Sequence, residues 1–376
     1  MKRKLFYLIA AVAGVIAAIT ALPDGRAQAV AASFSKPSAE KVILFASDGM
    51  RQDLMEAFAA EGAMPTYADL MRKGVVGANG LVQSFPPNTG VGWATLATGT
   101  YPGEHGSTNN TFHRTGEGNF NNRTSFAMTD ILQADTIQQA AERAGKKIAS
   151  VEWVGSRTIS PALAGPVIDF RNFFSTRGVL TFPLVAAEQA GAAAFGVSYQ
   201  VAAFAPASGW ANTPTGDDGV SPPLQTVLTV ATTFASQNPT RTYDVYIYDS
   251  LVNGFSAYDR VLLARSGVLK DASQAAANLG VGDWVDIRLV GADGLIGPRA
   301  GQTAGFYVKL IGLSGSAGGV SSFKLYFTSV TRAIAACLCD PNFESTLVDQ
   351  FPTSTAADFA PLEAGIVDED TYVEQG

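Results

Sequence analysis

The stretch "KVILFASDGMRQDLMEAFAAEG", Lys41 to Gly62, decides how the first half of the chain is interpreted. Its first part is a continuous apolar run closed by a turn, which is typical of a buried parallel strand. Its second part places Leu54 and Phe58 at helical spacing and stops at Gly62. Together the two parts predict a strand followed by a helix, the unit from which an α/β sheet is built.

A second helix and strand follow further along the chain. "DTIQQAAERAGKK" predicts a helix capped by Asp135 or Thr136 and stopped at Gly145, and "IASVEWVG" predicts the next strand. This alternation indicates a parallel sheet with helical crossovers over residues 41–195. Residues 196–332 differ, because β-branched and aromatic runs are separated there by Gly, Asp and Ser. The runs are "YDVYIYDS", "RVLLARS", "DWVDIRLVG", "AGFYVKLIGL" and "FKLYFTSV". They predict an all-β module, a small sandwich or barrel, set into or after the α/β part.

The first residues have the pattern of a secretory leader. "MKRK" is basic, an apolar run covers Leu5 to Leu22, and Ala27-x-Ala29 is an acceptable cleavage site. Residues 1–29 are therefore predicted to be a signal peptide, and residues 30–40 a tether. An uncleaved anchor is the alternative, because the apolar run nearly reaches the length that crosses a bilayer. After cleavage we expect a secreted or periplasmic protein without a membrane span.

Composition and charge narrow the class of protein. The 376 residues are 47% hydrophobic and 16% charged, which is globular composition. Without residues 1–29 the net charge falls to near −10, which argues against a nucleic-acid-binding surface. A phosphate substrate stays compatible, because bound metal ions reverse the local field. Residues 333–376 are acidic and partly helical in pattern, and we expect them to return to an α/β core that the chain leaves incomplete.

Asp48 and Thr89 are the candidates for chemistry. Asp48 follows the first predicted strand, and ligands of open α/β sheets bind beyond the carboxyl ends of strands. It is either a cation ligand or the N-cap of the next helix. Thr89 precedes Gly90 and Gly92, which would let the backbone turn sharply and present helix N–H groups to an anion. Its hydroxyl needs a base or a metal to become a nucleophile, and the alternative is an ordinary N-cap.

The segments "VILFASDGMRQDLM", "TGVGWATLATGTYPGEHG" and "STNNTF" resemble the type I phosphodiesterase/nucleotide pyrophosphatase family of the alkaline phosphatase superfamily. The resemblance covers about residues 41–195. It implies an alkaline-phosphatase-like α/β fold, with a mostly parallel sheet, flanking helices and an inserted β module. It also implies Asp48 as a metal ligand, Thr89 as the metal-bound nucleophile, and Gly92 and Asn110 at substrate-binding positions. In such enzymes two zinc ions activate the threonine and stabilise the phosphoryl oxygens.

The chain departs from the family pattern in two respects. Gly92 stands where the family usually has an asparagine that contacts a phosphate oxygen. The family's other ligands are an Asp-x-x-x-His, an Asp-His and a further His, and neither His105 nor His113 matches them. His113 is expected to be an exposed loop residue. Asp48 and Thr89 would make at most one partial metal site, so the chain is expected to be inactive alone. It is also expected to self-associate through an exposed sheet edge.

Two functions stay open at this point. The first is a hydrolase of small phosphodiesters or nucleotide pyrophosphates that is catalytically incomplete in this chain. The second is an exported non-catalytic remnant that binds a ligand through its β module. A sulfatase is disfavoured, because no Cys/Ser-x-Pro-x-Arg sequence lies around residue 89. Cys337 and Cys339 are expected to be small, partly buried residues, because a bond between residues two apart is sterically awkward. They also make a poor zinc site by themselves.

Overall fold

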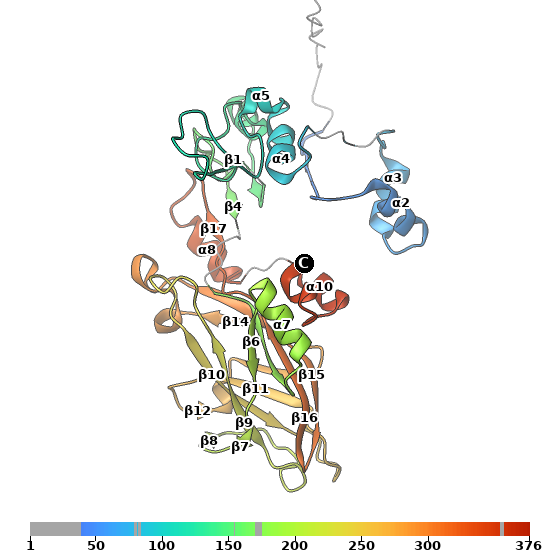
Figure 1. Ribbon diagram of the computed structural model, residues 1–376, viewed down its shortest axis with the longest axis vertical. Helices are drawn as coiled ribbons and strands as arrows, with labels where there is room; N and C mark the ends of the chain where they lie inside the picture. Colours follow the sequence, from blue (N-terminus) through green and yellow to red (C-terminus); the bar gives the residue numbers. More distant parts are fainter. Residues whose placement is uncertain (1–38, 79–80, 82–83, 154, 170–174, 354–356) are drawn as a thin grey trace, which may run out of the picture. The chain divides into compact units, whose positions relative to one another are not determined.

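The computed structural model describes residues 39–78, 81, 84–153, 155–169, 175–353 and 357–376. The predicted signal peptide, residues 1–29, lies outside the described residues, as does all but the end of the predicted tether. The chain divides into two compact units, Met1–Gly80 and Leu81–Gly376 (Figure 1). Within the described ranges, no helix combines the length and apolar character needed to cross a membrane.

The described part of the first unit contains the helices α2 (Gln52–Ala60) and α3 (Pro65–Lys73). The helix predicted from "RQDLMEAFAAEG" is confirmed as α2, and Gly62 beyond it is left-handed with φ +83°. The strand predicted before it is wrong. Residues 41–47 have no regular structure, and the side chain of Ile43 is 93% exposed. An apolar run becomes a buried strand only when neighbouring strands pair with it. The described residues of this unit contain no strand that could do so.

Two five-stranded sheets in the second unit share one hydrophobic core. Their strand orders are β13-β11-β10-β9-β7 and β14-β15-β16-β5-β6. The first sheet consists of β7 (Ala205–Pro206), β9 (Leu224–Val230), β10 (Arg241–Tyr248), β11 (Arg260–Arg265) and β13 (Ala277–Gly280). The second consists of β5 (Gly178–Phe182), β6 (Ser198–Val201), β14 (Trp284–Leu289), β15 (Ala304–Ser316) and β16 (Gly319–Phe327). Val245 and Leu263 of the first sheet and Phe306 and Leu325 of the second are fully buried in the shared core. The five predicted strands are confirmed, and the sheets form a sandwich rather than a barrel.

Short elements complete the sandwich. They are β8 (Trp210–Ala211), β12 (Lys270–Asp271) and the 3-10 helices η1 (Ala272–Gln274), η2 (Gly291–Asp293) and η3 (Gly297–Arg299). β8 and β12 pair in parallel, and Trp210 packs with Tyr246 and Tyr248 on the outer face of the first sheet.

The second sheet of the sandwich includes residues that precede position 196. β5 and β6 are parallel neighbours joined by α7 (Ala186–Phe195), and β5 pairs antiparallel with β16. The segments of α9 (Phe359–Glu363) and α10 (Glu369–Gln375) contact the same sheet, and the Tyr326 hydroxyl donates to Gln375 Oε1 at 3.1 Å. Figure 1 shows α7 and α10 beside this sheet. Elements from both sides of 195/196 and of 332/333 thus share this sheet. The predicted domain boundaries at these positions stay predictions.

The other elements of the second unit mix short helices and strands. The helices are α4 (Thr89–Thr98), α5 (Pro102–His105), α6 (Ile137–Arg143) and α8 (Phe343–Gln350). The strands are β1 (Thr111–Phe112), β2 (Thr124–Ser125), β3 (Ser150–Val151), β4 (Val167–Asp169) and β17 (Ile334–Ala335). β3 runs parallel to β4, and β17 joins β4 antiparallel. The predicted cap of α6 is confirmed as Thr136, which forms a capping box with Gln139. The chain is of mixed α/β class.

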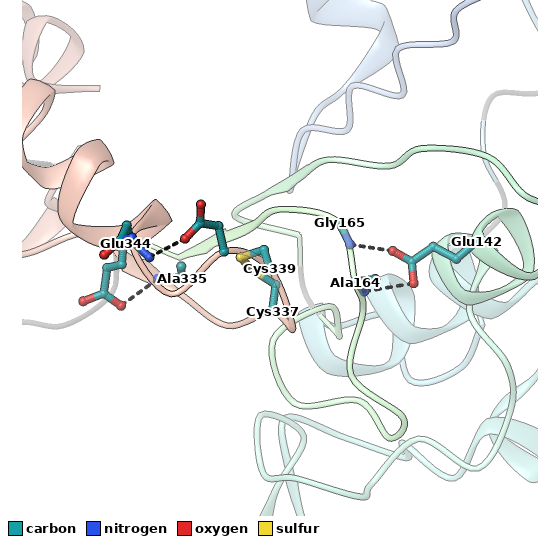
Figure 2. The surroundings of a disulfide bond; sticks show 9 residues. Glu142, Ala164, Gly165, Ala335, Cys337, Cys339 and Glu344 are labelled. Atoms are coloured by element: carbon teal, nitrogen blue, oxygen red, sulfur yellow. Dashed lines mark hydrogen bonds between the residues drawn. A yellow bond between two sulfur atoms is a disulfide. The ribbon is translucent and has the colours of Figure 1, made fainter.

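Cys337 and Cys339 are joined by a disulfide, which corrects the expectation that they do not pair. The chain bends over residues 337–339 and brings their Cα atoms to 5.2 Å, a separation that a disulfide spans. The bend follows β17, and Figure 2 shows the bond beside the loop that carries Ala164 and Gly165.

Candidate functional site

Thr89 is the first residue of α4, and Asn88 is its N-cap. The Asn88 side chain accepts a hydrogen bond from the Val91 N–H at 3.3 Å, as an N-cap residue does. The alternative in which Thr89 itself is the N-cap is therefore wrong. The helix ends at Gly99, whose left-handed φ of +67° is typical of a C-terminal stop.

Gly90, the next residue, is held on both sides of its backbone. Its N–H donates to Asn110 Oδ1 at 2.6 Å, and its carbonyl oxygen accepts from Ser107 Oγ at 3.0 Å. A Cβ atom at Gly90 would lie 2.8 Å from the Asn109 carbonyl oxygen and 2.9 Å from Phe126 Cγ. Glycine is thus required here for close approach of the 109–126 segment. It does not make the sharp turn that was expected, because Gly90 lies within the helix.

The N–H groups at the start of α4 are largely engaged within the protein. Gly90 N–H bonds to Asn110 and Val91 N–H to Asn88, while Gly92 N–H donates to the Asn88 carbonyl oxygen at 2.9 Å. Gly92, to which the family resemblance assigns a substrate-binding position, has its N–H in an ordinary helical hydrogen bond. The structure places the Asn110 carboxamide against the backbone of Gly90, the residue after Thr89.

His105 is fully buried beneath α4 and belongs to a hydrogen-bonded chain. Its Nδ1 accepts from the Ser107 N–H at 3.1 Å, so the neutral ring carries its proton on Nε2. Nε2 lies 3.0 Å from Thr95 Oγ1, which lies 2.7 Å from Ser84 Oγ. Burial lowers the pKa of His105 below that of a free histidine, which keeps the ring neutral. The network fixes two segments against Thr95 in the middle of α4. One is α5, and the other is the loop before α4 that carries Ser84.

His113 is half-buried, which corrects the expectation of an exposed loop residue. Its ring stacks on Phe120 with centroids 4.5 Å apart, and Nδ1 lies 3.4 Å from Glu117 Oε2. Its environment is therefore an aromatic and acidic contact within its own loop.

A small cavity of about 100 Å³ lies at the carboxyl ends of β3 and β4. Trp153, Arg157 and Asp169 line it, together with Phe126, which also approaches Gly90. The Trp153 ring makes an edge contact with Trp93 of α4 at 5.2 Å between centroids. Its buried Nε1 has no hydrogen-bond partner among the residues that the structure describes. Arg157 pairs with Asp169 at 2.7 Å.

These lining residues were not predicted as site residues. The one sequence signal for them is the Trp-x-Gly of "VEWVG", which follows the predicted strand that became β3. Arg157 and Asp169 come together only through the parallel pairing of β3 and β4, which the spacing along the chain does not reveal.

Asp48 belongs to the first unit, in the turn before Gly49 (φ +69°). Thr89 belongs to the second unit. No group of three or more His, Cys, Asp or Glu side chains in the described ranges is placed to hold a metal ion.

Comparison with known proteins identifies the lineage. The model of the type I phosphodiesterase / nucleotide pyrophosphatase family matches residues 42–236, just over half of the 376-residue chain. No curated protein and no solved structure matches the chain. The family hydrolyses small phosphodiester or nucleotide substrates and generally depends on metal ions. The matched segment contains α2, α4 and the cavity at β3 and β4, so the chain belongs to the type I phosphodiesterase / nucleotide pyrophosphatase family.

Proposed function

We propose that the chain binds a phosphodiester or nucleotide pyrophosphate group at the N-terminal end of α4, with Thr89 as the attacking nucleophile. The observation that supports this is the clamp on Gly90 by Asn110 and Ser107, which fixes the backbone beside Thr89. The N-terminal end of a helix also favours an anion through its dipole. A nucleophile whose backbone is already fixed loses less conformational entropy when it reaches the geometry for attack on phosphorus.

Asn110 would supply the contact to the phosphoryl group. Its Oδ1 already accepts the Gly90 N–H, so Nδ2 is the end of the carboxamide that carries donor hydrogens. A hydrogen bond from Nδ2 to an anionic oxygen is charge-assisted and stronger than a neutral one. Gly92 would contribute only space, because its N–H is used within the helix.

Asp48 would supply one carboxylate ligand to a cation. By the family resemblance Thr89 would be a second oxygen ligand, and two ligands are fewer than zinc requires, so we derive no catalytic step through a metal. We expect the chain by itself to bind the phosphodiester group with negligible turnover. The two-zinc arrangement belongs to the complete family site.

Binding and turnover test different parts of this proposal. Isothermal titration would measure binding of a non-hydrolysable phosphonate analogue of a phosphodiester to the full chain. Asn110→Asp keeps the acceptor for Gly90 but replaces the amide donors with a negative charge, so we expect the Kd to rise at least tenfold. Asn119→Ala, a loop residue whose Oδ1 accepts from the Asn121 N–H, is the matched control and should leave the Kd unchanged. Equal Kd values for wild type and Asn110→Asp would refute the phosphate site.

Hydrolysis of a nitrophenyl phosphodiester with added zinc tests whether the chain is incomplete. We expect the wild-type rate to stay within twofold of the Thr89→Ala rate. A zinc-dependent rate well above that control would show that the site is complete, while keeping Thr89 in its role. Absence of both binding and turnover would favour the non-catalytic alternative, in which the sandwich is the binding module.

A further inference from the structure

We propose that Cys337 and Cys339 form a reversible two-electron redox site that exchanges with an external dithiol. They are the only cysteines of the chain, and the structure joins them in a disulfide. Both residues are half-buried, and Leu338 between them is 72% exposed. Because neither cysteine is fully buried, a reductant can approach the bond without unfolding of the protein. Access to the sulfur atoms is one of the factors that set how fast a disulfide is reduced.

The disulfide adds little to what already holds this bend. Ala336 N–H donates to the Val167 carbonyl oxygen at 2.9 Å, and Leu338 N–H donates to the Leu163 carbonyl oxygen at 2.8 Å. On the other side, Glu344 Oε2 accepts the Ala335 N–H at 3.1 Å (Figure 2). A ring closed between residues two apart restricts the unfolded chain far less than a long loop does. The bond is therefore redundant as a cross-link.

The same hydrogen bonds keep the two thiols close after reduction. The Leu163 segment that accepts the Leu338 N–H is itself followed by a fixed turn, because the Glu142 carboxylate accepts the N–H groups of Ala164 and Gly165 (Figure 2). Two thiols held next to each other re-form their disulfide as an intramolecular step, which favours reversibility.

The surroundings of the two sulfur atoms differ. Cys337 packs against the apolar cluster of Ile159, Leu163 and Val167, whereas Cys339 is not part of that cluster. We therefore assign Cys339 Sγ as the atom attacked by the incoming thiolate. The first step forms a mixed disulfide at Cys339 and releases the Cys337 thiolate. The second thiol of the reductant then attacks the reductant sulfur that is bonded to Cys339. This step forms the disulfide of the reductant and releases the Cys339 thiolate. Two protons complete the two protein thiols, and the reductant leaves as its disulfide.

Charge selects the class of reductant. Asp340 follows Cys339 directly and is exposed. A carboxylate next to the attacked sulfur disfavours glutathione, which carries a net negative charge, relative to an uncharged dithiol. We expect Asp340→Asn to speed reduction by glutathione two- to fivefold at low salt, with no effect on reduction by dithiothreitol.

The test is a redox titration of the full chain without denaturant. The protein is equilibrated in mixtures of reduced and oxidised dithiothreitol, alkylated, and weighed by mass spectrometry, with near-ultraviolet circular dichroism as the measure of folding. We expect a reversible transition in which two alkyl groups appear together and the folded signal is retained. In single variants, Cys339 in Cys337→Ser should alkylate at least tenfold faster than Cys337 in Cys339→Ser. A bond that resists excess dithiothreitol until urea unfolds the protein would refute the proposal. So would thiols that never pair in oxidised buffer.

Discussion

Replacing Gly90 with alanine tests whether α4 is held by close contact with the 109–126 segment. The new methyl group would lie 2.8 Å from the Asn109 carbonyl oxygen, a backbone atom that cannot rotate away. Overpacking of this kind costs about 1–3 kcal/mol. A displaced segment also weakens the hydrogen bond from Gly90 to Asn110, a loss of about 1 kcal/mol. Alanine returns about 1 kcal/mol through its higher helix propensity. We expect α4 to lose roughly 2 kcal/mol of local stability.

Native-state hydrogen exchange measures this local stability directly. A loss of roughly 2 kcal/mol corresponds to about 30-fold faster exchange of the α4 amides that exchange through local opening. Gly103→Ala is the matched control, because Gly103 lies in α5 and a Cβ there would meet no atom within 4 Å. In Gly103→Ala, the α4 amides should exchange at the wild-type rate or more slowly. If Gly90→Ala exchanges no faster than wild type, the close packing of α4 against Asn109 is refuted.

Three further perturbations have defined outcomes. Because burial lowers the pKa of His105, the unfolded chain binds more protons than the folded one below about pH 6.5, so stability falls as the pH drops through that range. His105→Gln should remove that part of the pH dependence in urea unfolding at pH 7.5 and 5.5, and an unchanged slope would contradict the argument. Thr136→Ala removes the cap of α6 and should cost about 1 kcal/mol, whereas Thr136→Ser should cost little. Replacing both Cys337 and Cys339 with serine should lower the free energy of unfolding by only roughly 1.5 kcal/mol, and a loss above roughly 4 kcal/mol would show a structural cross-link.

The features that could be predicted from the sequence are those with a local cause. The N-cap of α6 was predicted at Asp135 or Thr136, and Thr136 fills it with a hydroxyl that accepts from the nearby Gln139 N–H. The strands β10 and β15 also follow their runs of β-branched and aromatic residues, because each alternation places one face in the sandwich core. Neither prediction required knowledge of distant parts of the chain.

The features that could not be predicted depend on partners distant in sequence. β5 looked like part of the α/β half, but it pairs with β16, more than 130 residues later. Gly90 looked like a turn residue, yet its requirement comes from Asn109 and Phe126. The cavity at Trp153 likewise depends on the pairing of β3 with β4. Local spacing identifies candidates, but only the fold decides what each one touches.

The segment at 41–47 connects this dependence on distant partners to the proposed metal ligand Asp48. Its apolar run predicts a strand as strongly as β10 does, yet Val42 and Ile43 are 85% and 93% exposed, while β10 residues such as Val245 are fully buried. Burying one such side chain contributes about 1.5–3 kcal/mol, so a run of four exposed apolar residues is a large unrealised stabilisation. That stabilisation becomes available only when another strand pairs with the run. Asp48 directly follows this run, so pairing of the run would place Asp48 at the carboxyl end of a strand, where ligands of open α/β sheets bind. A variant with Ile43→Asp should therefore leave the present fold unchanged by circular dichroism, and it should abolish any zinc affinity gained when a pairing strand is supplied. If Ile43→Asp unfolds the chain by itself, the segment is already part of a core and this reasoning fails.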